Sequence, residues 1–113
     1  YNRLANYLLG LCHEKLQNMG KAKEYFENVS TYKKESGTKI VRNDFFKLLS
    51  LEKLARERDK VALLSRIDEE SALNPTAAML RALYDKNQDQ VKALNLELQW
   101  ENRLMEILRN AVE

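Results

Sequence analysis

Glycine, proline and cysteine are scarce in this chain. Its 113 residues include three glycines, one proline and one cysteine. A strand-rich fold needs turn residues at intervals of roughly 8–12 positions, and this sequence cannot supply them. Residues that favour helices, such as Leu, Ala, Glu, Lys and Gln, are abundant instead. The sequence therefore predicts an all-α fold.

The single cysteine, Cys12, excludes an intramolecular disulfide. A lone thiol is typical of a reducing compartment, which favours the cytoplasm but leaves the localisation open. No apolar run approaches the roughly 18 residues of a membrane span, so no membrane partner is expected. Because the chain starts at Tyr1 without Met, we interpret it as a fragment of a longer protein.

An excess of one charge is also lacking. Lys and Arg number 19 against 17 Asp and Glu, which leaves a net charge of +2. This bias is too small to imply a nucleic-acid or membrane partner by itself. With 32% charged and 44% hydrophobic residues, the composition is that of a folded, soluble domain. The length suits one domain over residues 1–113.

Apolar residues recur at helical spacing along most of the chain. The pattern predicts helices at about 4–16, 22–32, 45–54, 61–67 and 78–83, and a long last helix from about 90 to 112. In the first helix the apolar stripe is Leu4, Leu8, Leu11, Cys12 and Leu16. Short polar connections separate the helices, so neighbours in sequence are expected to be antiparallel.

Two polar sites predict helix starts. Asn74 can cap a helix and Pro75 suits its first position, where no N–H group is needed. Asn43 or Asp44 is expected to cap the helix that carries Phe45. A polar connector over residues 33–44, which contains Gly37, precedes it.

The first two helices carry a family pattern, formed by Leu9-Gly10, Leu16, Ala22, Phe26 and Val29. It resembles the tetratricopeptide repeat (TPR), a 34-residue helix-turn-helix unit. In that family small residues sit where two helices cross closely and an aromatic residue fills the space between them. The resemblance assigns the close approach to Gly10 and Ala22, and the filling side chain to Phe26.

Two further units follow the same spacing with less identity. In the second, Leu54, Leu64 and Ile67 match the apolar positions, whereas Leu48 and Lys60 replace Gly10 and Ala22. In the third, Leu80, Tyr84 and Ala93 match family positions, whereas Arg81 and Glu97 replace the glycine and the aromatic residue. The resemblance implies repeat-like units at about 3–36, 41–74 and 74–107. It thus implies a TPR-like α-solenoid of about six antiparallel helices (three helical hairpins) with a long C-terminal helix; a generic helical bundle is the alternative.

No constellation for catalysis, metal binding or cofactor binding is predicted. The run Cys12-His13-Glu14 lacks the second histidine that a zinc-protease helix needs four residues later, and His13 is the only histidine. Activation of Cys12 would require a facing base, so we interpret it as a structural thiol. The pair Glu69-Glu70 is interpreted as a solvated helix face. We expect no enzyme activity.

A basic band surrounds two aromatic residues, Phe45 and Phe46, and could in principle hold nucleic acid by stacking and phosphate contacts. Acidic residues are interleaved with it, so nucleic-acid binding is disfavoured. The cations of the band are Lys33, Lys34, Lys39, Arg42, Lys47, Lys53, Arg56, Arg58 and Lys60.

The function implied by the TPR resemblance is a non-catalytic scaffold that binds a protein segment, or its own parent chain, along a concave face. The implied partner-binding residues are Tyr7, Leu11, Glu14, Arg42, Phe45, Leu49, Lys53, Ala82 and Lys86. For Leu11, Phe45 and Leu49 a place in the core is the favoured alternative. The alternative function is a homodimer that pairs through Trp100, Leu104 and Leu108 of the C-terminal helix.

Overall fold

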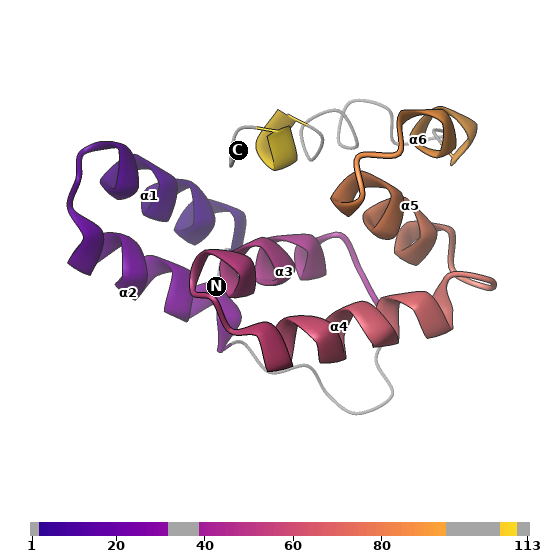
Figure 1. Cartoon of the computed structure of the whole chain (residues 1–113), viewed down its shortest axis with the longest axis horizontal. Coiled ribbons are helices and arrows are strands. Elements are labelled where there is room, and N and C mark those ends of the chain that lie inside the picture. Colours follow the sequence, from indigo (N-terminus) through magenta and orange to yellow (C-terminus); the bar gives the residue numbers. More distant parts are fainter. Residues whose placement is uncertain (1–2, 32–38, 95–106, 111–113) are drawn as a thin grey trace. The chain divides into compact units, whose positions relative to one another are not determined.

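The computed structural model describes residues 3–31, 39–94 and 107–110. Every element in these ranges is a helix, and none of these residues belongs to a strand (Figure 1). The all-α fold is therefore confirmed. In chain order the helices are α1 (Arg3–Lys15), α2 (Met19–Ser30), α3 (Asn43–Lys53), α4 (Glu57–Glu70), α5 (Pro75–Tyr84) and α6 (Gln88–Leu94).

The long C-terminal helix predicted from about 90 to 112 falls only partly within the described residues. Its start corresponds to α6, and residues 107–110 are helical near its expected end. Residues 95–106, which include Glu97, Trp100 and Leu104, lie outside the described residues, as does Tyr32. Leu108 is buried and its neighbour Ile107 is exposed. Pairing of two chains through this helix therefore stays a prediction.

The chain divides into two compact units. The first combines Tyr1–Thr38 with Asn43–Leu63, and the second combines Lys39–Arg42 with Leu64–Glu113. The single domain over residues 1–113 that the sequence predicts stays a prediction. Four residues of the connector thus belong to the second unit although both of their flanks belong to the first.

The core of the first unit is built around an aromatic cluster. Tyr7 on α1 is fully buried, and its ring centroid lies 5.7 Å from that of Phe26 on α2. The ring of Phe46 on α3 is 6.2 Å from Tyr7 on another side. Each of the three helices packs against the other two. Ala22 and Val29 complete the buried face of α2.

The buried face of α1 differs from the apolar stripe expected from the sequence. Arg3, Tyr7 and Gly10 are its buried residues. Leu8 is 39% exposed, Leu16 is 75% exposed and Cys12 is exposed. The expected leucine stripe is therefore wrong as the core face. The physical reason is that the large Tyr7 ring and the absence of a side chain at Gly10 together fit the ring of Phe26.

Gly10 is a close-approach position. A Cβ atom built on it would lie 2.7 Å from Cδ1 and 2.9 Å from Cζ of Phe26, and nearer still to Cε1. Ordinary contacts between carbon atoms are about 3.5–4.0 Å, so no side chain fits here. Glycine at position 10 thus lets the Phe26 ring lie against the backbone of α1.

Three of the turns between helices have the same geometry. Gln17, Ala55 and Lys86 adopt left-handed backbone angles, with φ of 61°, 56° and 58°. In each turn the following residue donates its N–H to a carbonyl five residues earlier: Asn18 to His13 at 2.8 Å, Arg56 to Leu51 at 3.0 Å and Asn87 to Ala82 at 3.0 Å. This is the Schellman motif. The turns join α1 to α2, α3 to α4 and α5 to α6.

The α4–α5 corner is built differently, because none of its residues has a positive φ. Asn74 caps α5 by accepting a hydrogen bond from the Thr76 N–H at 3.1 Å, and Pro75 occupies the first turn. This confirms the predicted helix start. One type of turn therefore recurs at three places in the described part of the chain, and a capped corner of a different type lies between the second and the third.

The positions of the left-handed turn residues can be compared with the third repeat-like unit expected from the sequence. Val91 lies five residues after Lys86, as Ala22 lies five residues after Gln17. Val91 is buried, whereas Ala93 is exposed. Counted from the turn residue, Val91 occupies the place of Ala22, whereas the match of Ala93 to Ala22 rests on residue identity. The repeat relationship itself stays a prediction.

The second unit packs α5 against α6. Ile67, Leu80 and Leu83 are among its buried residues. Arg109 from the helical residues 107–110 donates its Nε–H to the Tyr84 carbonyl at 3.0 Å, and its guanidinium lies 4.6 Å from the centre of the Tyr84 ring. This cation–π contact ties the later segment to the end of α5.

Candidate functional site

Four of the residues expected to contact a partner lie in the core. Tyr7, Phe45, Leu49 and Ala82 are all at most 2% exposed. A partner cannot reach them without opening the unit to which each belongs, so the assignment of these four to a binding surface is corrected. For Phe45 and Leu49 the structure favours the core alternative. The ring of Phe45 packs edge to face against that of Phe46, with 6.3 Å between the ring centroids, and therefore belongs to the core.

Glu14 and Lys53 are brought together. Lys53 Nζ lies 2.6 Å from Glu14 Oε1, and both side chains are partly exposed. This pair joins the last turn of α1 to the last turn of α3 in the first unit. Because the two charges already satisfy each other, a partner would meet a nearly neutral pair rather than a free cation.

The other three expected residues remain partly accessible. Leu11, Arg42 and Lys86 are each of intermediate exposure. Arg42 belongs to the second unit as part of the segment Lys39–Arg42. Lys86 adopts the left-handed backbone angles of the α5–α6 turn. Its backbone therefore shapes this turn, whether or not its side chain contacts a partner.

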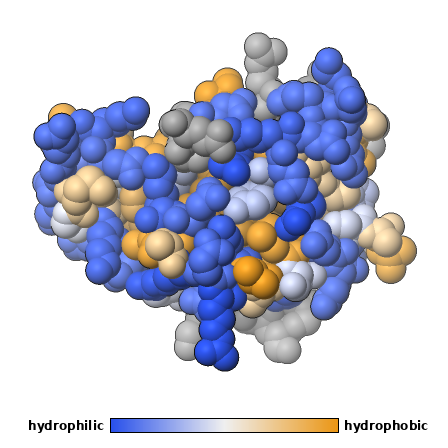
Figure 2. All heavy atoms as spheres, viewed as in Figure 1, coloured by the Kyte–Doolittle hydropathy of each residue, from blue (hydrophilic) through white to orange (hydrophobic). Residues whose placement is uncertain are grey.

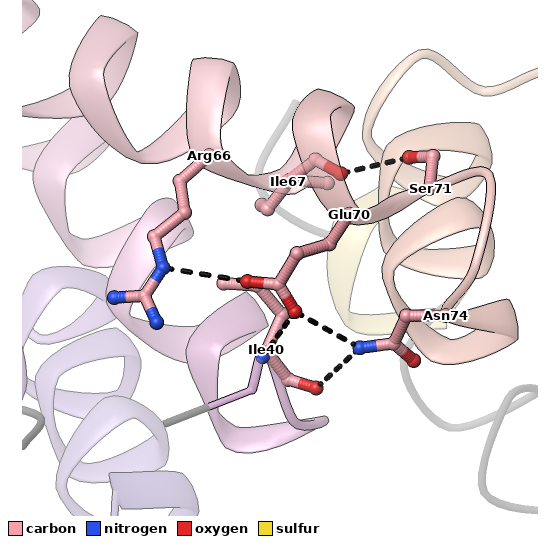
Figure 3. Close-up of polar contacts among 6 residues, drawn as sticks. All are labelled: Ile40, Arg66, Ile67, Glu70, Ser71 and Asn74. Atoms are coloured by element: carbon pink, nitrogen blue, oxygen red, sulfur yellow. Dashed lines mark hydrogen bonds and ion pairs between the residues drawn. The ribbon is translucent and has the colours of Figure 1, made fainter. Parts of the chain in front are cut away.

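A different polar cluster appears where α4 meets α5. Glu70 accepts a hydrogen bond from the backbone N–H of Ile40 at 2.9 Å, and Asn74 donates its Nδ2 to the Ile40 carbonyl at 3.1 Å. Asn74 Nδ2 also donates to Glu70 Oε1 at 3.2 Å. Figure 3 shows these two side chains converging on one residue of the connector. We call Glu70 and Asn74 the Ile40 clamp.

The Ile40 clamp is held in place from its own helices. Arg66, one turn earlier on α4, donates to the second oxygen of Glu70 at 3.4 Å. Ser71 donates its hydroxyl to the Ile67 carbonyl at 2.8 Å, which secures the end of α4 (Figure 3). Asn74 directs its other amide atom, Oδ1, to the Thr76 N–H. Each clamp side chain therefore has a local contact that fixes its orientation.

The chemistry of Glu70 reflects this arrangement. The hydrogen bond from the Ile40 N–H holds the pKa of Glu70 below its ordinary value, with smaller contributions from Asn74 and Arg66, while burial opposes them. Glu70 is therefore ionised at neutral pH. The expectation of a solvated Glu69-Glu70 face is wrong for Glu70, although Glu69 is exposed.

A buried ion pair was not foreseen from the sequence. Arg3 Nη1 lies 3.3 Å from Asp44 Oδ1, and the side chain of Asp44 is fully buried. The expectation that Asn43 or Asp44 caps α3 is corrected, because α3 begins at Asn43 and both residues lie in its first turn. The sequence does place Arg3 four residues before Tyr7, on the same helical face, but this spacing does not identify Asp44 as its partner.

The Cys12-His13-Glu14 run shows no arrangement for catalysis. Cys12 is exposed, and the ring of His13 stacks on Tyr25 of α2 at 5.4 Å. Within residues 3–31, 39–94 and 107–110, no three His, Cys, Asp or Glu side chains are grouped so that they could hold a metal ion. The three side chains of the run thus point to different surroundings, as their helical spacing requires.

The basic band includes cations that pair with acidic side chains and aromatic residues that are buried. Its aromatic residues, Phe45 and Phe46, are buried, so neither presents a ring face on which a base could stack. Arg56 lies 2.9 Å from Glu27, and Lys60 lies 2.9 Å from Glu57. Lys33 and Lys34 lie outside the described residues.

The surface that Figure 2 presents is mostly hydrophilic, with apolar residues reaching it in separate places. The large apolar side chains exposed in the first hairpin are Leu8, Leu9, Leu16 and Met19. None of the described helices combines the length and hydropathy needed to cross a membrane.

The TPR resemblance rests on the residues and turns given above. Compared with models of known protein families, with curated proteins and with solved structures, the chain matches none of them.

Proposed function

We propose that this chain is a non-catalytic, TPR-like scaffold that binds a protein segment or another part of its parent protein. The observation that carries the proposal is the recurrence of one Schellman turn at Gln17, Ala55 and Lys86. A hairpin repeated with the same turn is the building unit of helical solenoids. Such arrays act by presenting a surface, and they have no need of a reactive group.

The packing of Gly10 against Phe26 supports the same proposal. The TPR resemblance assigned a close helix approach to Gly10 and a filling role to Phe26, and the two residues are in contact. In the proposed array the first helix of each hairpin lines the binding face. The accessible residues that we assign to that face are Leu11, Glu14 and Lys53 in the first unit and Arg42 and Lys86 in the second, and the charged groups among them would orient a partner of mixed charge.

The test is a pull-down from source lysate with three charge variants and one apolar variant. Lys53→Glu places two carboxylates together, whereas Lys53→Glu with Glu14→Lys restores the ion pair in reverse order. Both the single and the double variant should lose the partner if the face recognises it by charge. The double variant should keep the thermal stability of the wild type. Glu14→Lys alone completes the cycle.

Leu8→Glu with Leu16→Glu changes one exposed leucine of α1 and one that directly follows it, and leaves the proposed face intact. We expect this variant to retain the partner. A partner that binds all charge variants equally but not the leucine variant would contradict the concave-face proposal. If every variant recovers the partner equally, the concave-face proposal is again contradicted, and if the wild type recovers no protein, the scaffold function itself is contradicted.

A further inference from the structure

The Ile40 clamp recognises one residue in the way that a protein recognises a bound peptide. Both main-chain groups of Ile40 are engaged by side chains, the N–H by Glu70 and the carbonyl by Asn74 (Figure 3). The Ile40 side chain is only 2% exposed. Extended peptides are held by this combination of main-chain hydrogen bonds and a buried side chain.

The clamp is largely pre-organised. Asn74 is fixed by its cap contact with Thr76, and Arg66 holds the free oxygen of Glu70. None of these contacts involves the connector. A site whose donor and acceptor are oriented before the peptide arrives binds with a smaller ordering penalty.

The occupant has a defined chemistry. Ile40 lies in a non-helical stretch and carries a β-branched aliphatic side chain. Its neighbours Lys39 and Arg42 are basic, while α4 ends in the acidic run Asp68-Glu69-Glu70. The segment is therefore basic and the end of α4 acidic, although Asp68 and Glu70 also pair with Arg81 and Arg66.

We propose that the α4–α5 corner is a binding site for an extended peptide with β-branched aliphatic residues between basic residues, the first of them buried, and that Lys39–Arg42 occupies it as a built-in competitor. The site lies within the second unit and does not depend on the TPR-like face of the proposed function. A partner segment of this chemistry binds when the chain's own segment leaves.

Tethering sets the strength of the competition. A segment joined by a short linker has an effective concentration in the millimolar range (about 1 mM or more). An outside peptide sees only the fraction of molecules whose site is vacant, so its apparent affinity falls in proportion to that fraction. Weakening the internal segment should therefore reveal the site.

The probe is a fluorescein-labelled hexapeptide with the sequence Thr-Lys-Ile-Val-Arg-Asn, measured by anisotropy against the full chain. Ile40→Asp places a carboxylate beside Glu70 and expels the internal residue; Ile40→Ala removes most of its side chain and is the milder form. We expect either variant to bind the hexapeptide about tenfold more tightly than the wild type does.

Two matched controls define the contact. Asn74→Asp, added to Ile40→Ala, keeps an oxygen that can cap α5 but loses the amide donor to the peptide carbonyl. A hexapeptide N-methylated at isoleucine loses the N–H that Glu70 accepts. Each control should abolish the gain in affinity. Equal binding by wild type and both Ile40 variants, or equal binding of the N-methylated peptide, would overturn the proposal.

A measurement on the wild type covers the case in which the variants fail to fold. Excess hexapeptide should speed hydrogen exchange at the Ile40 amide and leave the amides of α5 unchanged, because only the internal segment is displaced. Unchanged exchange at Ile40 with millimolar peptide would show that the segment is a fixed structural contact. Loss of this site would leave the Glu14–Lys53 test of the proposed function unaffected.

Discussion

Individual residues set the spacing between α1 and α2, and Gly10 is the residue where a single methyl group matters most. The ring of Phe26 occupies the space that a Cβ atom would need. Phe26 is itself buried, so its ring cannot move out of the way without disturbing Tyr7. Strain at this position should therefore appear directly as lost stability.

Gly10→Ala should lower the free energy of unfolding by about 1–3 kcal/mol through overpacking, even though alanine favours helices by about 1 kcal/mol over glycine. The measurement is a denaturant titration followed by circular dichroism. Gly20→Ala is the matched control, because nothing lies within 4 Å of its added Cβ. The control should be neutral or stabilising, and equal losses from both changes would contradict the close approach.

The buried face of α1 could not be predicted from the spacing of its apolar residues. The spacing of Leu4, Leu8 and Leu11 correctly predicted a helix, but the helix turns Tyr7 and Gly10 inward. Hydrophobic periodicity counts apolar residues without weighing the area of a tyrosine ring or the value of a missing side chain. The family resemblance, which assigned a role to Gly10, carried the information that periodicity lacked.

Elements are joined here by turns that lack their usual sequence signal. A Schellman turn normally has glycine at its left-handed position, whereas this chain has Gln17, Ala55 and Lys86 there. Polarity and broken periodicity predicted helix breaks near all three sites. The turn type could not be predicted, because the residue that adopts the positive φ is not a glycine in any of the three turns.

Ala55→Gly should stabilise the α3–α4 turn by about 0.5–1 kcal/mol, because glycine adopts a positive φ without the penalty that a Cβ imposes. Ala62→Gly, on an exposed position of α4, is the same chemical change in a helix interior and should destabilise by about 1 kcal/mol. Thermal melts of the two variants should shift in opposite directions. Shifts of the same sign would argue against the turn geometry.

Long-range polar contacts between elements could not be predicted from the sequence. Asn74 was correctly predicted as a helix cap, but its second contact, to the Ile40 carbonyl, spans 34 residues. Arg3 and Asp44 are separated by 41 residues. A side chain's local pattern identifies its helix position, whereas its distant partner depends on how the helices pack.

At the scale of the whole molecule, the two units should respond differently to acid. Glu70 contributes to the second unit while it is ionised, and its pKa is held below the ordinary value. A carboxyl group with a lowered folded pKa stabilises above its unfolded pKa, which is about 4.3 for glutamate. That contribution is lost as the pH falls through the lowered folded value.

Wild type and Glu70→Gln should therefore differ most at neutral pH and converge as the medium becomes more acidic than about pH 4. Hydrogen exchange of α5 amides should report the difference, since α5 belongs to the second unit. Amides of α1 serve as the internal reference and should exchange equally in both proteins. A difference that stays constant across this pH range would contradict the role assigned to the ionised carboxylate.

The order in which a ribosome would make the chain gives the Ile40 clamp a further consequence. Ile40 leaves the ribosome before its partners, because Glu70 and Asn74 follow it by 30 and 34 residues. At roughly 5–20 residues per second, the delay lasts about two to seven seconds. The first hairpin and α3 can assemble during that interval, while the main-chain groups of Ile40 remain bound to water. The connector can therefore take its place only after the α4–α5 corner has been synthesised, and unit two closes around a segment made before most of that unit.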